Sequence, residues 1–368
     1  MSEVLDLEKV SVDQNPVIQK MLQNEHEQIV FCQDKVSGLK AIIAIHNTTL
    51  GPALGGTRMW MYDNEVEALN DVLRLSRGMS YKASISGLNL GGGKAVIIGD
   101  SYTQKTEALF RRFGKFVDSL NGKYITAEDV GVSPREMEFV NMETKHVTGL
   151  PESLGGSGDP SPVTAYGVYM GMKAAAKEQW GSDSLSGKRV LVQGVGHVGQ
   201  TLVDYLSKEN ASIMLCDINE GRVNEIAAKY GAEVIADKDL FETDMDIYAP
   251  CALGATLNDN SIGKLKAQIV AGAANNQLAD ENTHGKMLQE KGIIYAPDFL
   301  INAGGLINVY REVAGISREK AMELTENIYN TTLDIFSKAN EQGITTHKAA
   351  LQIAEERIAS VANIKTRL

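Results

Sequence analysis

The stretch that decides the fold is Gly194-Val195-Gly196-His197-Val198-Gly199. An apolar run, residues 189–193, precedes it. A helical pattern follows it, carried by Val198, Leu202, Val203 and Leu206. A strand, a glycine loop with GxGxxG spacing and a helix together predict a βαβ unit of the Rossmann type. The loop as a whole, from Gly194 to Gly199, is therefore the predicted cofactor-binding segment.

Each glycine of this loop has its own physical reason. Gly194 permits the tight turn, Gly196 lets a pyrophosphate approach the backbone, and Gly199 lets the helix pack close to the strand. Asp217 ends the next strand, about 20 residues further on, and can accept hydrogen bonds from both adenosine ribose hydroxyls. Its charge repels a 2′-phosphate and favours NAD over NADP, although Arg222 can weaken that exclusion. A glycine turn in a non-binding α/β domain is the alternative.

Towards the N-terminus, two lysines lie twelve positions apart, in Ser80-Tyr81-Lys82 and Gly91-Gly92-Gly93-Lys94. A glycine-rich turn before Lys94 is expected to bring the backbone close to a ligand. One lysine can then hold a carboxylate while the other does proton chemistry. Asp129 follows a predicted strand, 124–127, where functional carboxylates often lie. On residue type alone, the lysines fit an ordinary surface, and Asp129 fits a helix N-cap.

The remaining pattern predicts alternating strands and helices. A helix ending near Gly78-Met79 is expected to deliver Lys82 into the next segment, and residues 149–162 (GLPESLGGSGDPSP) are expected to form a linker or active-site loop. Further strands are predicted at 28–33, 39–46 and 95–98, and helices at 16–22, 103–120, 163–180, 318–342 and 346–364.

Composition excludes several classes of protein. Apolar residues make up 43% of the 368, and the net charge of −11 comes from scattered acids, so no concentrated basic face is available for nucleic acid. The three cysteines, Cys32, Cys216 and Cys251, are far apart, which favours a reducing cytoplasm over a disulfide framework. We expect no metal site, no membrane span and no secretory signal at the N-terminus.

Seven stretches together resemble the glutamate/leucine/phenylalanine/valine dehydrogenase family, over residues 28 to 365. They are Gly51-Pro52-Ala53-Leu54-Gly55-Gly56-Thr57-Arg58, Gly78-Met79-Ser80-Tyr81-Lys82, Gly91-Gly92-Gly93-Lys94, Thr126-Ala127-Glu128-Asp129, Pro160-Ser161-Pro162-Val163-Thr164, Ala274-Asn275-Asn276 and Ile301-Asn302-Ala303-Gly304-Gly305. Within the family, the chain is most similar to the leucine enzymes.

The resemblance implies a set of catalytic roles. Lys82 matches the lysine that binds the substrate α-carboxylate, Lys94 matches the catalytic lysine, and Asp129 matches the acid that shuttles protons. The implied reaction converts L-leucine, NAD and water into 4-methyl-2-oxopentanoate, ammonia and NADH. Lys94 can take a proton from the attacking water only if its pKa falls from about 10.4 towards neutrality. Burial and a nearby cation would lower it, and Asp129 would raise it.

The resemblance also implies the ligand contacts. Gly55 and Gly56 match a turn against the substrate. An apolar side-chain pocket is formed by Leu54, Ala127, Leu306 and Val309; without a cation there, a second carboxylate would be costly to bury. Leucine enzymes tend to have valine at the position of Leu306. Thr164, Asn276 and Asn302 match residues near the nicotinamide, and Asn276 and Asn302 also lie near the substrate. On residue type alone, the four apolar residues fit an ordinary core, and the asparagines fit turn caps.

The prediction is therefore an α/β protein of two domains separated by a cleft. An N-terminal catalytic domain, 1–150, is joined by C-terminal helices at 335–368, and a Rossmann NAD-binding domain covers 151–334. The resemblance implies a homo-oligomer, with octamers typical of the leucine enzymes. Rival functions are a phenylalanine or valine dehydrogenase, a catalytically silent NAD-binding protein and a 2-hydroxy acid dehydrogenase. The last of these needs a histidine general acid in the cleft, whereas His197, the one histidine in a ligand-binding motif, is expected at the pyrophosphate.

Overall fold

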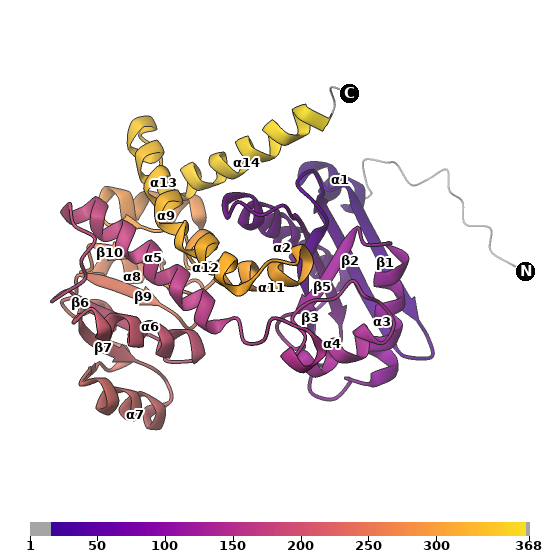
Figure 1. Ribbon diagram of the computed structural model, residues 1–368, viewed down its shortest axis with the longest axis horizontal. Helices are drawn as coiled ribbons and strands as arrows, with labels where there is room; N and C mark the ends of the chain where they lie inside the picture. The colour runs from indigo at the N-terminus through magenta and orange to yellow at the C-terminus, as the bar shows by residue number, and fades with distance from the viewer. Residues whose placement is uncertain (1–15, 366–368) are drawn as a thin grey trace, which may run out of the picture. The chain divides into compact units, whose positions relative to one another are not determined.

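The computed structural model describes residues 16–365, which form two compact units (Figure 1). Within the described residues, the first unit comprises 16–84, Asn89–Gly156 and 361–365. The second comprises Ile85–Leu88 and Ser157–Ser360. The α/β class is confirmed by the two sheets and their covering helices. The predicted return of residues 335–368 to the first domain stays a prediction, and the N-terminal signal question lies outside the described residues.

The first unit is built on a five-stranded mixed sheet of order β1-β2-β4-β3-β5. Its strands are β1 (Gln28–Asp34), β2 (Leu39–Asn47), β3 (Ala53–Trp60), β4 (Gly91–Ile98) and β5 (Tyr124–Glu128). β2 runs antiparallel to β1 and β4, while β3 is parallel to both β4 and β5. The parallel half places the ends of β3 and β5 at one edge, where the candidate acid follows β5.

Helices cover both faces of this sheet (Figure 1). One face packs against α2 (Glu65–Ile85) through Leu69, Val72 and Leu73, which lie at helical spacing. The other face packs against α3 (Glu107–Ser119) and α4 (Pro134–Asn141) through a core that includes Phe110 and Phe113. The short helix α1 (Pro16–Gln23) precedes β1. Because both faces are covered, β2 and β4 are buried along almost their whole length.

The second unit contains a parallel six-stranded sheet of order β11-β10-β9-β6-β7-β8. This is the doubly wound order of dinucleotide-binding domains, with β6 as its first strand. The strands are β6 (Arg189–Gln193), β7 (Ser212–Cys216), β8 (Glu233–Val234), β9 (Ile247–Pro250), β10 (Ile269–Val270) and β11 (Ile294–Tyr295). The predicted βαβ unit is confirmed: α6 (His197–Lys208) joins β6 to β7.

The other elements of the second unit are helical. They are α5 (Ser161–Trp180), α7 (Glu220–Tyr230), η4 (Asp237–Glu242), α8 (Asp259–Lys264), α9 (Glu281–Glu290), α10 (Asp298–Ile301), α11 (Gly304–Ala314), α12 (Arg318–Glu326), α13 (Ile328–Gln342) and α14 (Thr346–Lys365). Residues 361–365 of α14 belong to the first unit, as does the short helix η3 (Glu152–Leu154). No helix among residues 16–365 is long and apolar enough to cross a membrane.

Three local predictions were wrong. The helix expected to end near Gly78 continues to Ile85, so Lys82 lies in its last turn. The Gly91–Gly93 segment is part of strand β4, not a turn before Lys94. Gly55 and Gly56 also lie inside a strand, β3, which the pattern did not predict. In both strands the glycines serve close packing: a Cβ on Gly92 would lie 2.2 Å from the backbone nitrogen of Ser80.

Candidate active site

A buried lysine and a carboxylate meet on one face of the first unit's sheet. Lys94 lies on β4, with 7% of its surface exposed. Its Nζ is 2.6 Å from Oδ2 of Asp129, the residue that follows β5. β3 lies between β4 and β5 in the sheet, so the two side chains meet across it. The structure thus brings together the two residues assigned to proton transfer from sequence.

Gly56 makes the room for this contact. It lies on β3 opposite Ala127, and a Cβ built on it would be 2.4 Å from the carbonyl oxygen of Glu128 and 2.9 Å from Cβ of Asp129. Distances this short require the backbone of the neighbouring strand to move. A glycine is therefore needed at this position to let the carboxylate lie over β3.

The electrostatics of the pair follow from burial and neighbouring charge. Burial lowers the pKa of Lys94 below its ordinary value, Asp129 opposes the shift, and Arg58 adds to it. Burial alone would raise the pKa of Asp129, but the positive charges of Lys94 and Arg58 outweigh it, and the pKa is lowered. The carboxyl group is thus held ionised, while the amine loses its proton more readily than an exposed lysine does.

The face that carries Lys94 also carries two of the predicted pocket residues. Leu54 pairs with Gly92 on β4, and alternation along β4 puts Gly92 and Lys94 on the same face. Ala127 is the register partner of Gly56, two residues after Leu54 on β3. Both Leu54 and Ala127 are buried. Gly55 lies between Leu54 and Gly56 on β3, where a Cβ would be 1.7 Å from the carbonyl oxygen of Gly93.

Lys82, the lysine assigned to the substrate carboxylate, lies on α2. It is half-buried in the last turn of this helix, and the preceding Ser80 packs against Gly92. The Ser80 hydroxyl is also 2.7 Å from Nδ1 of His46 on β2, both side chains being buried. These contacts fix the end of α2 against the strands that precede Lys94, and they set the origin of the Lys82 side chain.

The second unit holds the predicted nucleotide loop, and its geometry fits a dinucleotide. Gly194 has φ +95°, which favours glycine, and a Cβ there would lie 2.7 Å from Ala252. Gly196 is exposed and has no atom within 4 Å of a Cβ position, which leaves space for phosphate. A Cβ on Gly199 would lie 2.0 Å from the carbonyl oxygen of Gly194. His197 begins α6, whose free N–H groups attract anions.

Asp217 is oriented by two backbone N–H groups. Val195 donates to Oδ2 at 2.7 Å, and Asn219 donates to Oδ1 at 2.8 Å. Each carboxylate oxygen has a second lone pair, so the group can still accept hydrogen bonds from ribose hydroxyls. Arg222 donates to Gln200 on α6 at 3.5 Å and lines a cavity of about 510 Å³ with Asn219 and Lys229.

The nicotinamide-side residues lie elsewhere in the second unit. Thr164, on α5, donates to the carbonyl of Pro160 at 3.0 Å. Asn302 is buried and donates to the carbonyl of Ala273 and the side chain of Asn275, so it orders the segment before Asn276. Asn276 itself is exposed with φ +53°.

The second unit also carries the other two pocket residues, Leu306 and Val309. They are one turn apart on α11, buried and half-buried respectively.

Comparison with known proteins identifies the family of this chain. Residues 26–146 match the Glu/Leu/Phe/Val dehydrogenase dimerisation domain, and residues 155–223 and 213–365 match the Glutamate/Leucine/Phenylalanine/Valine dehydrogenase domain. The chain belongs to this family. A leucine dehydrogenase from Thermoactinomyces intermedius is 56% identical over 92% of each chain, and one from Bacillus subtilis is 54% identical over 92% of this chain and 93% of its own. A crystal structure of L-tryptophan dehydrogenase from Nostoc punctiforme superposes with a TM-score of 0.86 at 46% identity, covering 94% of this chain and 99% of that one.

The residues that surround Lys94 and Asp129 were not predicted from the sequence. Arg58 lay in a quoted motif without a role, yet its Nε is 3.3 Å from Oδ2 of Asp129. Asp71 and Tyr62 extend this contact away from the site. A signal existed for Arg58, since it is a charged residue at the end of a run that is otherwise small and apolar. Asp71 offered none, because a single acid on an amphipathic helix is ordinary.

Proposed function

We propose that the chain catalyses the reversible NAD-dependent oxidative deamination of branched-chain L-amino acids, with L-leucine as the preferred substrate. The products are the 2-oxo acid, ammonia and NADH. The observation that carries the proposal is the buried contact of 2.6 Å between Lys94 Nζ and Asp129 Oδ2. An amine of lowered pKa beside an ionised carboxylate is the pair that proton transfer to and from water and an amino group requires.

The roles of the side chains follow from their charges. Lys82, a cation at the end of α2, is assigned to the substrate α-carboxylate. Lys94 in its neutral form removes a proton from the water that attacks the oxidised carbon, and the ionised Asp129, in contact with the resulting ammonium, takes up that proton and passes it to the departing amine. A nicotinamide held by the Gly194–Gly199 loop and Asp217 would supply the oxidant for the substrate Cα. Closing the site against bulk water would favour the oxidation of the substrate Cα.

The apolar face beside Lys94 supports an aliphatic substrate. Leu54 and Ala127 bring no charge to it, so a second substrate carboxylate would be buried without a partner. The leucine dehydrogenases are 54–56% identical to this chain, against 48% for L-tryptophan dehydrogenases and 46% for a phenylalanine dehydrogenase. Leucine and isoleucine differ in the position of one methyl group, and valine has one methylene group fewer, so we expect all three to react within about 10–200-fold of one another.

The cofactor and assembly complete the proposal. NAD, with the Gly194–Gly199 loop at its pyrophosphate and Asp217 at its adenosine ribose, is supported by the two hydrogen bonds that orient the carboxylate. A homo-oligomer is supported by the match of residues 26–146 to a dimerisation domain, and an octamer is its proposed size. The proposed location is the cytoplasm. The proposed domain limits are 1–150 with 335–368, and 151–334.

The proposal is tested by measuring initial rates of NADH absorbance with leucine, isoleucine, valine, phenylalanine and glutamate side by side. We expect leucine to give the highest kcat/KM, and we expect glutamate to give no rate above background. A higher kcat/KM for phenylalanine would replace the substrate assignment. Absence of NADH production from all five would instead indicate a silent cofactor-binding protein.

The same assay tests the catalytic lysine. Lys94→Ala is expected to lower kcat by about a thousandfold or more, because general-base catalysis alone contributes roughly 10²–10⁴-fold. Lys115→Ala removes an exposed ion-paired lysine from the same unit and serves as the matched control. A folded Lys94→Ala protein that deaminates leucine at the parental rate would contradict the proposal.

A further inference from the structure

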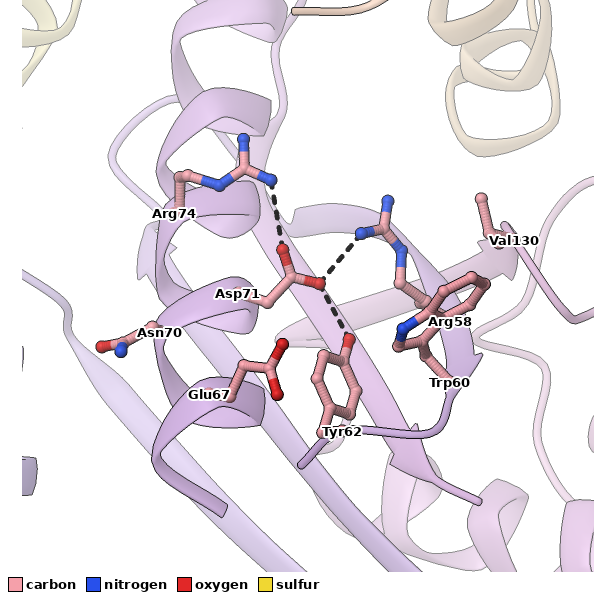
Figure 2. A pocket seen from close by; sticks show the side chains of 8 residues that line it. All are labelled: Arg58, Trp60, Tyr62, Glu67, Asn70, Asp71, Arg74 and Val130. Carbon is pink, nitrogen blue, oxygen red and sulfur yellow. Dashed lines mark hydrogen bonds and ion pairs between the residues drawn. The ribbon is translucent and has the colours of Figure 1, made fainter. Parts of the chain in front are cut away.

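A line of charged contacts leads from the lysine–aspartate pair to the middle of α2. Oδ2 of Asp129 is 2.6 Å from Lys94 Nζ and 3.3 Å from Nε of Arg58. Nη1 of the same arginine is 2.9 Å from Oδ2 of Asp71. Figure 2 shows the Arg58–Asp71 contact from the cavity of about 540 Å³ beside it. One guanidinium thus joins the reacting carboxylate to a second carboxylate on a helix.

The far end of this line is itself fixed. The Tyr62 hydroxyl donates to Oδ2 of Asp71 at 2.8 Å, and Nη2 of Arg74 is 3.1 Å from Oδ1 (Figure 2). Only 22% of the Arg58 side chain and 16% of the Asp71 side chain are exposed. A planar guanidinium bonded at two of its nitrogens has little rotational freedom. Arg58 therefore presents Nε to Asp129 in one orientation.

We propose that Arg58 is a positioning residue that holds the Asp129 carboxylate between itself and Lys94, with Asp71 holding Arg58 in place. The inference rests on the proposed function for its kinetic readout. Arg58 shares the very oxygen that contacts Lys94, so it restricts where that oxygen can lie. Without it, the carboxylate keeps its contact with Lys94 but loses its second charged partner, so it can rotate more widely about χ1 and χ2 and the proton-transfer distance is less tightly fixed.

The charges along this line predict opposite effects on Lys94. Among the described residues, the charged and titratable groups that act on Lys94 or on its partner Asp129 include Arg58 on β3, Tyr62 after that strand, Asp71 on α2 and Tyr124 on β5. The positive charge of Arg58 favours the neutral amine of Lys94, and the negative charge of Asp71 favours the ammonium. Removing the arginine must therefore raise the pKa of Lys94, whereas removing the aspartate must lower it.

The experiment compares pH profiles of kcat for leucine deamination in Arg58→Gln, Asp71→Asn, Arg58→Lys and the parent. In Arg58→Gln, we expect kcat to fall at least tenfold, KM for leucine to change less than about threefold, and the rising limb to move to higher pH. In Asp71→Asn, the limb is expected to move to lower pH. Each shift is on the order of half a pH unit or more, as expected for one unit charge near a partly buried site.

Two further variants separate charge from position. Arg58→Lys keeps the positive charge but loses the planar guanidinium with its two bonded nitrogens. We therefore expect the rising limb of the pH profile to return towards its parental pH while kcat remains reduced. Arg112→Gln removes an arginine of the same unit that pairs with Asp34 at a partly exposed position, and its pH profile is expected to match that of the parent. A purely structural role for Arg58 would lower thermal stability without moving the limb.

A readout that needs no turnover keeps this inference separate from the proposed function. The protein is treated with trace acetic anhydride at a series of pH values, and mass spectrometry then measures the acetylation of the peptide that contains Lys94. The extent of acetylation reports the fraction of Lys94 that is a neutral amine. We expect its midpoint to rise in Arg58→Gln and fall in Asp71→Asn, even if the parent were inactive towards every amino acid. Midpoints and limbs that stay at the parental pH in both variants, or that move in the same direction, would overturn the role of Arg58.

Discussion

At the scale of single residues, the site depends on where side chains are missing as much as on where they are present. Lys94 and Asp129 meet because β3 carries a glycine between them, and a Cβ on Gly56 would fall 2.9 Å from the Asp129 side chain. The resemblance of the sequence to its family indicated that Gly55 and Gly56 matter. It did not indicate why, because the close approach involves β5, about seventy residues further along the chain.

Gly56→Ala tests this explanation. We expect the added methyl to push the Glu128–Asp129 backbone away from β3 and to lower kcat by roughly a hundredfold, since a displacement of about 1 Å can cost that much. The matched control is Gly78→Ala: Gly78 is an exposed glycine inside α2, with no atom within 4 Å of its Cβ position. That change is expected to raise the free energy of unfolding by about 0.5–1 kcal/mol and to leave kcat alone. Equal activity in both variants would refute the steric explanation.

A second prediction at this scale concerns the size of the pocket. Ala127 is buried beside Gly56 on the face that carries Lys94 and Leu54. Ala127→Gly removes a methyl group, and we expect kcat/KM for phenylalanine relative to leucine to rise roughly tenfold, within the range that one such group can supply. The two substrates are measured on the same preparation, so a general loss of stability cancels in the ratio. An unchanged ratio would remove Ala127 from the pocket.

At the scale of elements, a structure set by neighbouring residues could be predicted from the sequence, whereas a structure set by distant contacts could not. The β6–α6–β7 unit was predictable because its glycine spacing, its apolar runs and Asp217 lie within about thirty residues of one another. The strand character of Gly91–Gly93 was not, since glycine is a poor strand former by itself. The carbonyl of Asn47, Ser80 and the ring of Tyr124 crowd these three glycines from three other elements. That crowding selects glycine and keeps the segment extended.

The length of α2 was misjudged for a related reason. Gly78 lowers helix propensity locally, which in the sequence resembles a helix end. The helix continues because its last turns are fixed by tertiary contacts. Nε2 of His26 is 2.8 Å from the hydroxyl of Ser76, and Nδ1 of His46 is 2.7 Å from that of Ser80. The two imidazole rings stand edge to face, with centroids 4.9 Å apart.

These two histidines predict acid sensitivity. Burial lowers the pKa of His26 to about 4 and that of His46 to about 3, against about 6.5 in an unfolded chain. As pH falls below about 6.5, the unfolded chain takes up protons that the folded chain refuses, so stability decreases by up to about 1.4 kcal/mol per pH unit for each histidine. Above about pH 7.5 both states hold neutral imidazole, and this contribution is constant.

The measurement is the thermal midpoint of the parent and of His26→Gln/His46→Gln between about pH 8 and pH 5. The glutamines have no charge to gain, so we expect the double variant to lose less stability than the parent over that range. The comparison at about pH 8 serves as the control for any packing effect of the substitutions. Parallel curves for the two proteins would show that other groups dominate the acid response.

At the scale of the whole molecule, the chain divides its tasks between units that each have their own core. Lys94 and Asp129 belong to the first unit, whereas the Gly194–Gly199 loop and Asp217 belong to the second. The contact between Lys94 and Asp129 joins two residues of the first unit, and the hydrogen bonds from Val195 and Asn219 to Asp217 join residues of the second. Cofactor binding and proton transfer should therefore respond separately to substitution.

This separation can be tested with two variants and two assays. Lys94→Ala should lose turnover yet bind NADH, followed by fluorescence, with a Kd within about twofold of the parent. Asp217→Ala removes the carboxylate that accepts from Val195 and Asn219, so we expect Kd for NADH to rise at least tenfold and the preference over NADPH to shrink. At saturating NAD, its pH profile for leucine should still match the parent, because Lys94, Asp129 and Arg58 are untouched. If Lys94→Ala weakened NADH binding as strongly as Asp217→Ala does, the cofactor site would have to depend on the first unit, and the division of tasks would be wrong.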